Sequence, residues 1–218
     1  MTRFKNKYRT ESNRMPGWDY SGDGRYFITL VTQNGECTLG EVLDNNGRAY
    51  LLLSDFGKIV KNEFLKSFEI RNELSLDEYI IMPNHLHAIV MLKKDKIILD
   101  SHKSDVFHVE THGRASLHEK HSPNLSSNQP IEFFRKPKSI SSFIGGYKSS
   151  INTKTDDYID ANNLDLPKFN KNNHFFQANY YDHIIRNDSE YWQIKSYIKN
   201  NPKNWIYDKF NKDNNVEL

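Results

Sequence analysis

The stretch Asp77-Glu78-Tyr79-Ile80-Ile81-Met82-Pro83-Asn84-His85-Leu86-His87-Ala88-Ile89-Val90-Met91-Leu92 decides the fold of this chain. From Leu86 onward its residues are small or aliphatic and include no glycine, which predicts a buried strand. Pro83 cannot donate to a sheet ladder, so we expect it at a strand start or a bulge. A strand repeats every two residues, so His85 and His87 should share one face, roughly 6.5–7 Å apart along the chain.

Two imidazoles on one face of a strand can bind a single cation between them. They can equally be hydrogen-bonded core or edge histidines, because a buried imidazole is costly without a partner. The spacing alone leaves both interpretations open.

Composition bounds the class of protein. The 218 residues suffice for one good-sized domain or a domain with appendages, and 37% hydrophobic with 27% charged residues is typical of a globular protein. The net charge of +2 does not indicate a polyanionic partner, so local charge must decide that question. A single cysteine, Cys37, excludes an internal disulfide and fits the reducing cytoplasm. We expect no signal peptide and no transmembrane segment.

The remaining pattern predicts alternating strands and helices. Residues 25–32, 38–43 and 49–53 have strand composition, and Asp44-Asn45-Asn46-Gly47 predicts a hairpin turn between the last two. Ser54 or Asp55 should cap a helix that runs to about Phe68. Residues 174–186 predict an extended segment ending in a strand, followed by a helix that stops at Asn200-Asn201-Pro202.

Residues 94–130 form a polar run that we interpret as a solvated insertion within a single domain spanning 1–218, with polar N- and C-terminal extensions. The run contains histidines at 102, 108, 112, 118 and 121, whose spacing matches no metal-ligand pattern.

A second informative helix is predicted at residues 140–154, with apolar residues at 140, 143, 144, 147 and 151. Two central glycines weaken it by roughly 1 kcal/mol each, a cost that usually marks close packing or a hinge. Residues 135–154 contain no acid and five basic residues, which are Arg135, Lys136, Lys138, Lys148 and Lys154. With the strands, these helices predict an α+β fold, most simply a ferredoxin-like antiparallel sheet with helices packed on it.

Tyr147 lies within the apolar stripe of this helix, where a tyrosine is usually a core aromatic. Its flanking Gly145-Gly146 and Lys148 instead indicate close backbone approach and a positive environment beside a phenol. A phenol is a weak nucleophile at its ordinary pKa near 10 and needs a base or an activated electrophile. A cation on His85 and His87 could polarise a phosphoryl oxygen for it.

Several blocks of the chain resemble one family in the right order. Met82-Pro83-Asn84-His85-Leu86-His87 resembles the HUH motif (His, bulky hydrophobe, His) of single-tyrosine HUH nucleases, and more narrowly of REP-associated tyrosine transposases. The blocks at 15–20, 26–29 and 142–149 resemble the N-terminal region and the tyrosine helix of that family. Asn179-Tyr180-Tyr181-Asp182-His183-Ile184-Ile185-Arg186 and Tyr197-Ile198-Lys199-Asn200-Asn201-Pro202 resemble its C-terminal signature.

The resemblance implies a ferredoxin-like enzyme of DNA transposition and recombination that cuts and rejoins single-stranded DNA at a hairpin. Tyr147 would form a 5′-phosphotyrosine link, and His85 and His87 would hold Mg²⁺ or Mn²⁺, of which two imidazoles favour Mn²⁺. The family's third, polar ligand lies about one turn beyond the tyrosine. Position 151 is Ile, which leaves three alternatives open, Asn152, Gln177 and His183.

We expect DNA phosphates to contact Arg135, Lys136, Lys138, Lys148, Lys154 and Arg186. Trp18 and Tyr20 are expected to anchor the N-terminal arm to the core, with base stacking as the alternative. The sequence leaves monomer and homodimer open. Two other functions also stay open, a domesticated hairpin-binding protein without catalysis and a metal-dependent hydrolase of a small phosphoester.

Overall fold

A computed structural model describes residues 3–4, 7–8, 15, 17–94, 137–170 and 172–212. All of them belong to one compact unit formed by Met1–Lys94 and Arg135–Leu218. The insertion predicted at 94–130 lies outside the described residues, apart from its first position, as do its five histidines. No helix among the described residues is long and apolar enough to cross a membrane.

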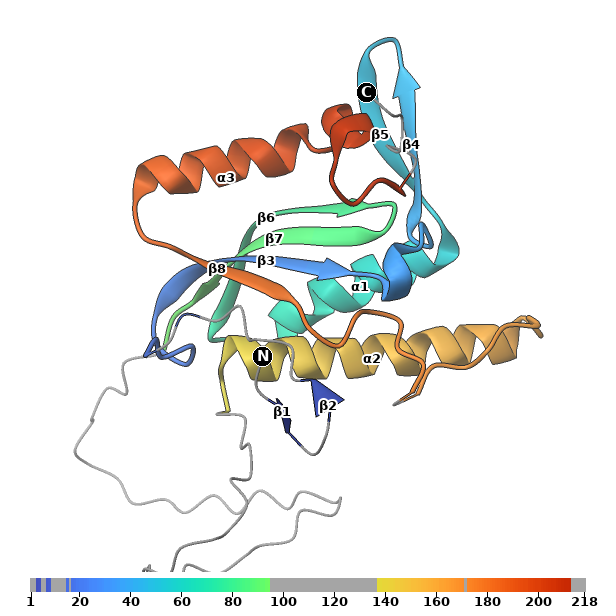
Figure 1. Ribbon diagram of the computed structural model, residues 1–218, viewed down its shortest axis with the longest axis horizontal. Coiled ribbons are helices and arrows are strands. Elements are labelled where there is room, and N and C mark those ends of the chain that lie inside the picture. The colour runs from blue at the N-terminus through green and yellow to red at the C-terminus, as the bar shows by residue number, and fades with distance from the viewer. Residues whose placement is uncertain are drawn as a thin grey trace, which may run out of the picture. The chain divides into compact units, whose positions relative to one another are not determined.

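A four-stranded antiparallel sheet organises this unit (Figure 1). Its strands are β3 (Gly24–Val31), β6 (Leu74–Met82), β7 (His85–Leu92) and β8 (Tyr181–Ile185), in the spatial order β6-β7-β3-β8. With α1 (Asp55–Ile70) between β3 and β6, and α2 (Ile140–Ala161) between β7 and β8, the chain runs βαββαβ. This order is that of the ferredoxin-like fold, so the predicted fold class is confirmed.

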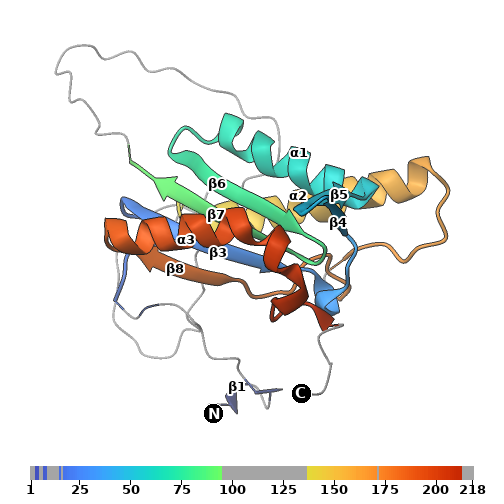
Figure 2. The same cartoon turned by 90° about the horizontal axis from the view of Figure 1, so that it is seen from above.

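Helices cover both faces of the sheet (Figures 1 and 2). α1 and α2 lie side by side on one face, where Val60, Phe64, Phe143 and Tyr147 join Leu86 and Ala88 in the main core. α3 (Asp188–Asn200) lies across the other face, where Ile198 packs with Ile89 and Ile185 in a smaller apolar cluster. Alternate residues of β7 therefore face different helix layers, as the two-residue repeat of a strand requires.

The sequence interpretation took residues 77–92 as one strand-bearing stretch, and the structure corrects it to two strands. β6 and β7 pair along their whole length, with Met82 opposite His85, so Pro83 and Asn84 form the turn between them. The Asn84 carbonyl accepts hydrogen bonds from the backbone and the hydroxyl of Thr32, which fixes this turn against the end of β3. Pro83 needs no ladder partner in a turn.

A second, separate sheet is the hairpin of β4 (Gly40–Asn45) and β5 (Arg48–Leu53), with the turn at the predicted position. It leads into α1, whose N-cap is Ser54, because the Ser54 hydroxyl accepts from the backbone N–H of Gly57. A Cβ at Gly57 would stand 2.0 Å from the Leu39 carbonyl oxygen, so only glycine allows α1 to begin this close to the preceding loop. Short elements complete the fold: β1 (Arg3–Phe4), β2 (Lys7–Tyr8), η1 (Gln33–Gly35) and η2 (Pro202–Tyr207).

Candidate metal and tyrosine site

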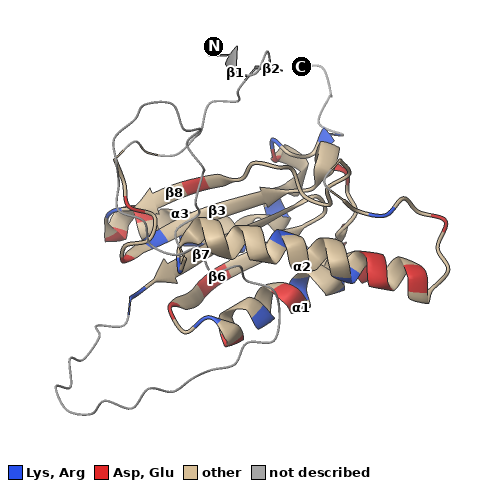
Figure 3. Cartoon of the chain, turned by 90° about the horizontal axis from the view of Figure 1, so that it is seen from below, with Lys and Arg blue, Asp and Glu red and all other residues tan. Residues whose placement is uncertain are grey.

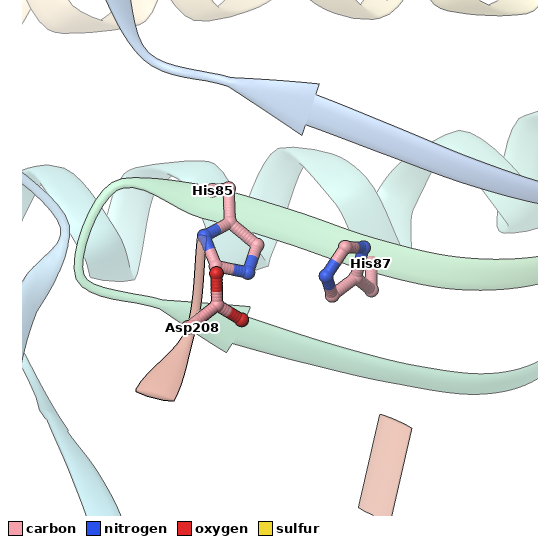
Figure 4. Close-up of side chains that lie close together, drawn as sticks. All are labelled: His85, His87 and Asp208. Carbon is pink, nitrogen blue, oxygen red and sulfur yellow. The ribbon is translucent and has the colours of Figure 1, made fainter. Parts of the chain in front are cut away.

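His85 and His87 project from β7 (Figure 4) on the face of the sheet that α3 covers, since Tyr197 of α3 contacts His87. Their ring centroids are 4.5 Å apart, which confirms that they share one face. Both side chains are buried, with 0% and 2% of their surface exposed. Each ring must therefore have defined hydrogen-bond partners or a ligand.

Asn84 fixes the tautomer of His85. The Asn84 amide nitrogen donates to the carbonyl oxygens of Gly35 (3.0 Å) and Phe210 (2.7 Å), so the amide oxygen is the atom that faces His85 Nδ1 at 2.9 Å. This oxygen only accepts, so Nδ1 must carry the hydrogen and Nε2 must carry the lone pair. Such a contact is typical of the outer partners that orient a metal-binding histidine.

His87 connects the sheet to α3. Its Nδ1 lies 2.8 Å from the hydroxyl of Thr29 on β3, and its Nε2 lies 3.1 Å from the hydroxyl of Tyr197 on α3. If Nδ1 donates to Thr29, Nε2 is left to accept from the phenol. Tyr197 thus stands where a base can take its proton.

A carboxylate and an amide complete the group. His85, His87 and Asp208 place one possible ligand atom each within 4.8 Å of one another (Figure 4). Asn201, one helical turn beyond Tyr197, is buried and its side chain lies within hydrogen-bond distance of Asp208 (3.4 Å). In the part of the chain that the structure describes, His85 Nε2 and Asn201 Oδ1 are buried atoms without a hydrogen-bond partner of good geometry. Two neutral imidazoles, together with the carboxylate oxygen of Asp208 and the amide oxygen of Asn201 as possible ligands, fit a divalent transition metal.

Burial sets the protonation states of the site. It lowers the pKa of His85 to about 4, with Lys209 adding to the shift and Asp208 opposing it. Burial and the neighbouring His85 hold the pKa of His87 well below its ordinary value. Burial also raises the pKa of Tyr197, as does Asp208, while Asn201 lowers it. Both imidazoles are therefore neutral near pH 7, the form in which they bind metal, and the phenol keeps its proton.

Residues 202–212, which we name the C-terminal segment, cover the two histidines. The Phe210 ring lies 4.7 Å from the His85 ring, and the Trp205 ring lies 6.0 Å from it. The hydrogen bond from the Asn84 side chain to the Phe210 carbonyl holds the C-terminal segment over the histidines.

The structure does not bring Tyr147, the predicted nucleophile, to this site. Tyr147 is 2% exposed, its hydroxyl donates to the Val60 carbonyl at 3.0 Å, and its ring packs on Phe64. These partners belong to α1, on the face of the sheet opposite to His85 and His87. Burial holds its pKa well above the ordinary value. Tyr147 is therefore a core aromatic, as its place among the apolar residues of the helix indicated.

None of the three predicted third ligands joins the histidines either. Asn152 accepts from the backbone N–H of Phe175, and Gln177 donates to the Thr32 carbonyl. His183 lies on the same side as His87 but pairs with Glu190 at 2.6 Å. Asp208 is the side chain that lies within reach of both histidines, with Asn201 beside it. A signal for this was present in the sequence, since Tyr197 and Asn201 have the four-residue spacing that Tyr147 and Ile151 fail to satisfy.

The predicted DNA-binding residues are dispersed. Arg135 and Lys136 lie outside the described residues, and Lys138 is exposed just before α2. Lys148 donates to the carbonyls of residues 177–179, Lys154 pairs with Asp157, and Arg186 contacts Met15. Figure 3 shows acidic residues beside the basic ones along α2, with acids toward its C-terminal end. Trp18 donates to the Tyr26 hydroxyl and Tyr20 packs on the Tyr26 ring, as expected of core anchors.

No protein-family model matches the chain. An uncharacterised protein of Haemophilus influenzae is 27% identical over 204 residues, which is 92% of each chain. A solved REP-associated tyrosine transposase bound to a REP hairpin is 15% identical, covering 93% of this chain and 76% of that one, with a TM-score of 0.43. A candidate transposase of Deinococcus radiodurans is 14% identical, covering 86% and 95%, with a TM-score of 0.36. Both TM-scores lie below 0.5, so the function of this chain must be argued from its own residues.

Proposed function

We propose that this protein cleaves and rejoins single-stranded DNA with Tyr197 as the nucleophile. The observation that carries the proposal is the 3.1 Å contact between the Tyr197 hydroxyl and His87 Nε2, at the edge of the buried group formed by His85, His87 and Asp208. Tyr197 lies on α3 and is directed at the HUH-like histidine pair, whereas Tyr147, to which the resemblance assigned the nucleophilic role, lies on the other face of the sheet. That resemblance supplies the substrate class.

His85, His87 and an oxygen of Asp208 or Asn201 would hold the cation, with Mn²⁺ preferred over Mg²⁺ because two ligands are imidazoles. A bound cation would polarise a non-bridging phosphate oxygen and neutralise charge that develops there. His87 has one lone pair at Nε2, so it either accepts the phenol hydrogen or ligates a metal. In the second state the Tyr197 hydroxyl is free to reach a phosphate.

The Tyr197 oxygen would form a bond to phosphorus while the bond from phosphorus to the 3′ oxygen breaks. The phenol proton ends, through solvent or a side chain, on the departing 3′ oxygen. The products are a 5′-phosphotyrosine and a free 3′-hydroxyl. Because the new ester keeps the phosphodiester energy, attack by a 3′-hydroxyl rejoins the strand without a nucleotide cofactor.

A labelled hairpin oligonucleotide with single-stranded flanks, incubated with Mn²⁺ and run on a denaturing gel, tests the proposal. Wild-type protein should give a covalent adduct, Tyr197→Phe should give none, and Tyr147→Phe is the matched control that should still give one. An adduct that persists in Tyr197→Phe but disappears in Tyr147→Phe would return the nucleophile to α2. Turnover of a small phosphoester without DNA binding would favour the hydrolase.

The second candidate is a hairpin-binding protein without catalysis on the same fold. It is favoured by the near-complete burial of His85 and His87 beneath the C-terminal segment, which keeps a phosphate from the histidines in this conformation. Salt-sensitive binding of the hairpin without any adduct under Mn²⁺ would support it.

A further inference from the structure

The C-terminal segment has two different sides. Its only acid, Asp208, is buried and directed at the histidines. Its three lysines, at 203, 209 and 212, are exposed, as are Ile206 (59%) and Tyr207 (80%). Because the segment turns its carboxylate inward, its exposed side chains carry positive charge, apolar surface and the neutral amide of Asn204, and no negative charge.

These lysines differ from three lysines on or beside the helix layer of the other face. Lys58, Lys154 and Lys168 each pair with an aspartate there. Within the described residues, Lys203, Lys209 and Lys212 form no ion pair, and Lys209 lies over the Phe210 ring at 4.9 Å. Lys209 is also close enough to lower the pKa of both His85 and His87. The unpaired positive charge of this region therefore lies beside the candidate site.

The apolar part of the surface extends beyond the segment. β5 packs against η2 and exposes Tyr50 and Leu52, which are two residues apart on one face of the hairpin. Tyr207 exposes most of its ring, and an exposed ring can stack on any unpaired base, since every base has a π-face. Aromatic rings interleaved with lysines are the usual composition of a single-strand binding surface.

We propose that the C-terminal segment is a docking surface for single-stranded DNA, in which Lys203, Lys209 and Lys212 contact phosphates and Tyr207 stacks on an unpaired base. The inference rests on the proposed function for its partner and goes beyond it by moving the DNA interface from the α2 region to this segment. The charge is complementary to a polyanion, and the surface leads directly to the residues that cover His85. DNA bound here would place its backbone next to the histidines.

The test is binding of a fluorescent single-stranded oligonucleotide in EDTA, in the Tyr197→Phe background, at several salt concentrations. Replacing Lys203, Lys209 and Lys212 by Gln should reduce the slope of log affinity against log salt by about 2, at roughly 0.7 per phosphate contact. The control variant has the same net charge, with Lys58, Lys66 and Lys168 replaced by Gln. It should keep the salt dependence of the Tyr197→Phe parent. Equal slopes in the two triple variants would overturn the inference.

Tyr207→Ala should weaken binding by roughly tenfold or more, whereas Tyr207→Phe, which keeps the ring, should bind as the parent does. Oligonucleotide affinity unchanged in Tyr207→Ala would likewise overturn the inference, and a changed sedimentation coefficient with unchanged affinity would assign the surface to a second copy of the chain. Absence of any single-strand binding by the parent protein would instead contradict the proposed function. The two failures are therefore distinguishable.

Discussion

At the scale of single residues, Asn84 contributes more to the site than its place in a turn suggests. One side-chain amide holds His85 in the tautomer that leaves Nε2 as a ligand and also ties down the carbonyl of Phe210. The sequence indicated the Met-Pro-Asn context of the histidines, but the contact with Phe210 joins residues 126 positions apart and only the fold reveals it.

We expect Asn84→Ala to reduce Mn²⁺ affinity by about 10- to 100-fold, the usual effect of removing an outer partner of a metal-bound histidine. Titration calorimetry measures the affinity, and ¹⁵N shifts of the His85 ring in metal-free protein should report a mixture of tautomers. Asn84→Asp keeps an acceptor for Nδ1–H and should retain the single tautomer. A wild-type affinity in a folded Asn84→Ala protein would show that His85 does not need this contact.

Tyr147 and Tyr197 illustrate what residue-level reasoning can decide. Both lie on helices with polar neighbours, and the Lys148 and glycine context of Tyr147 indicated chemistry, yet the apolar spacing at 140, 143, 144 and 151 correctly predicted a core face. The position of a helix on one face of the sheet or the other is a tertiary property. It cannot be obtained from the periodicity of the helix alone.

Tyr147→Phe removes one buried hydrogen bond, to Val60, and keeps the ring that packs on Phe64. The free energy of unfolding should fall by about 1 kcal/mol, the usual net value of such a bond, and is measured by urea titration. Adduct formation should stay at the wild-type level. A stable Tyr147→Phe protein that has lost adduct formation would contradict the core assignment.

At the scale of elements, composition and caps predicted most helices and strands. β3, β5 and α1 match the expected ranges within a few residues because their apolar patterns and the Ser54 cap are local signals. β6 was not separated from β7, because it is an edge strand whose Ser75, Asp77 and Glu78 interrupt the apolar run. The His85–His87 pair followed from the strand repeat, whereas Asp208 reaches it only through the course of α3 across the sheet.

The C-terminal segment acts as a cover in this conformation, so loosening it should expose the histidines. Phe210→Ala removes the ring 4.7 Å from His85 and should speed the reaction of the site histidines with diethyl pyrocarbonate in metal-free protein. Peptide mapping by mass spectrometry follows the peptide that contains His85 and His87. The partly exposed His174 does not contact Phe210 and provides an internal reference. Equal modification rates in both proteins would mean that the cover already opens freely.

At the scale of the whole molecule, acid should destabilise the metal-free protein through its two buried imidazoles. Their pKa values are lowered in the fold, that of His85 to about 4, whereas an unfolded histidine titrates near 6.5. Between about pH 6.5 and pH 4 the unfolded chain binds more protons than the folded one. The free energy of unfolding should therefore decrease as the pH falls through this window, by at most about 1.4 kcal/mol per pH unit and histidine.

Urea titrations in EDTA from pH 7.5 to pH 4.5 measure this dependence, and the variant His85→Gln with His87→Gln provides the comparison. Carboxylates with lowered pKa values, such as Glu190, are present in both proteins and cancel in the difference. Wild-type protein should lose more stability toward acid than the double variant. Added Mn²⁺ should steepen the wild-type curve, because only neutral imidazoles bind metal and the bound state is lost as they protonate. Parallel curves for the two proteins would show that His85 and His87 are not held neutral by the fold.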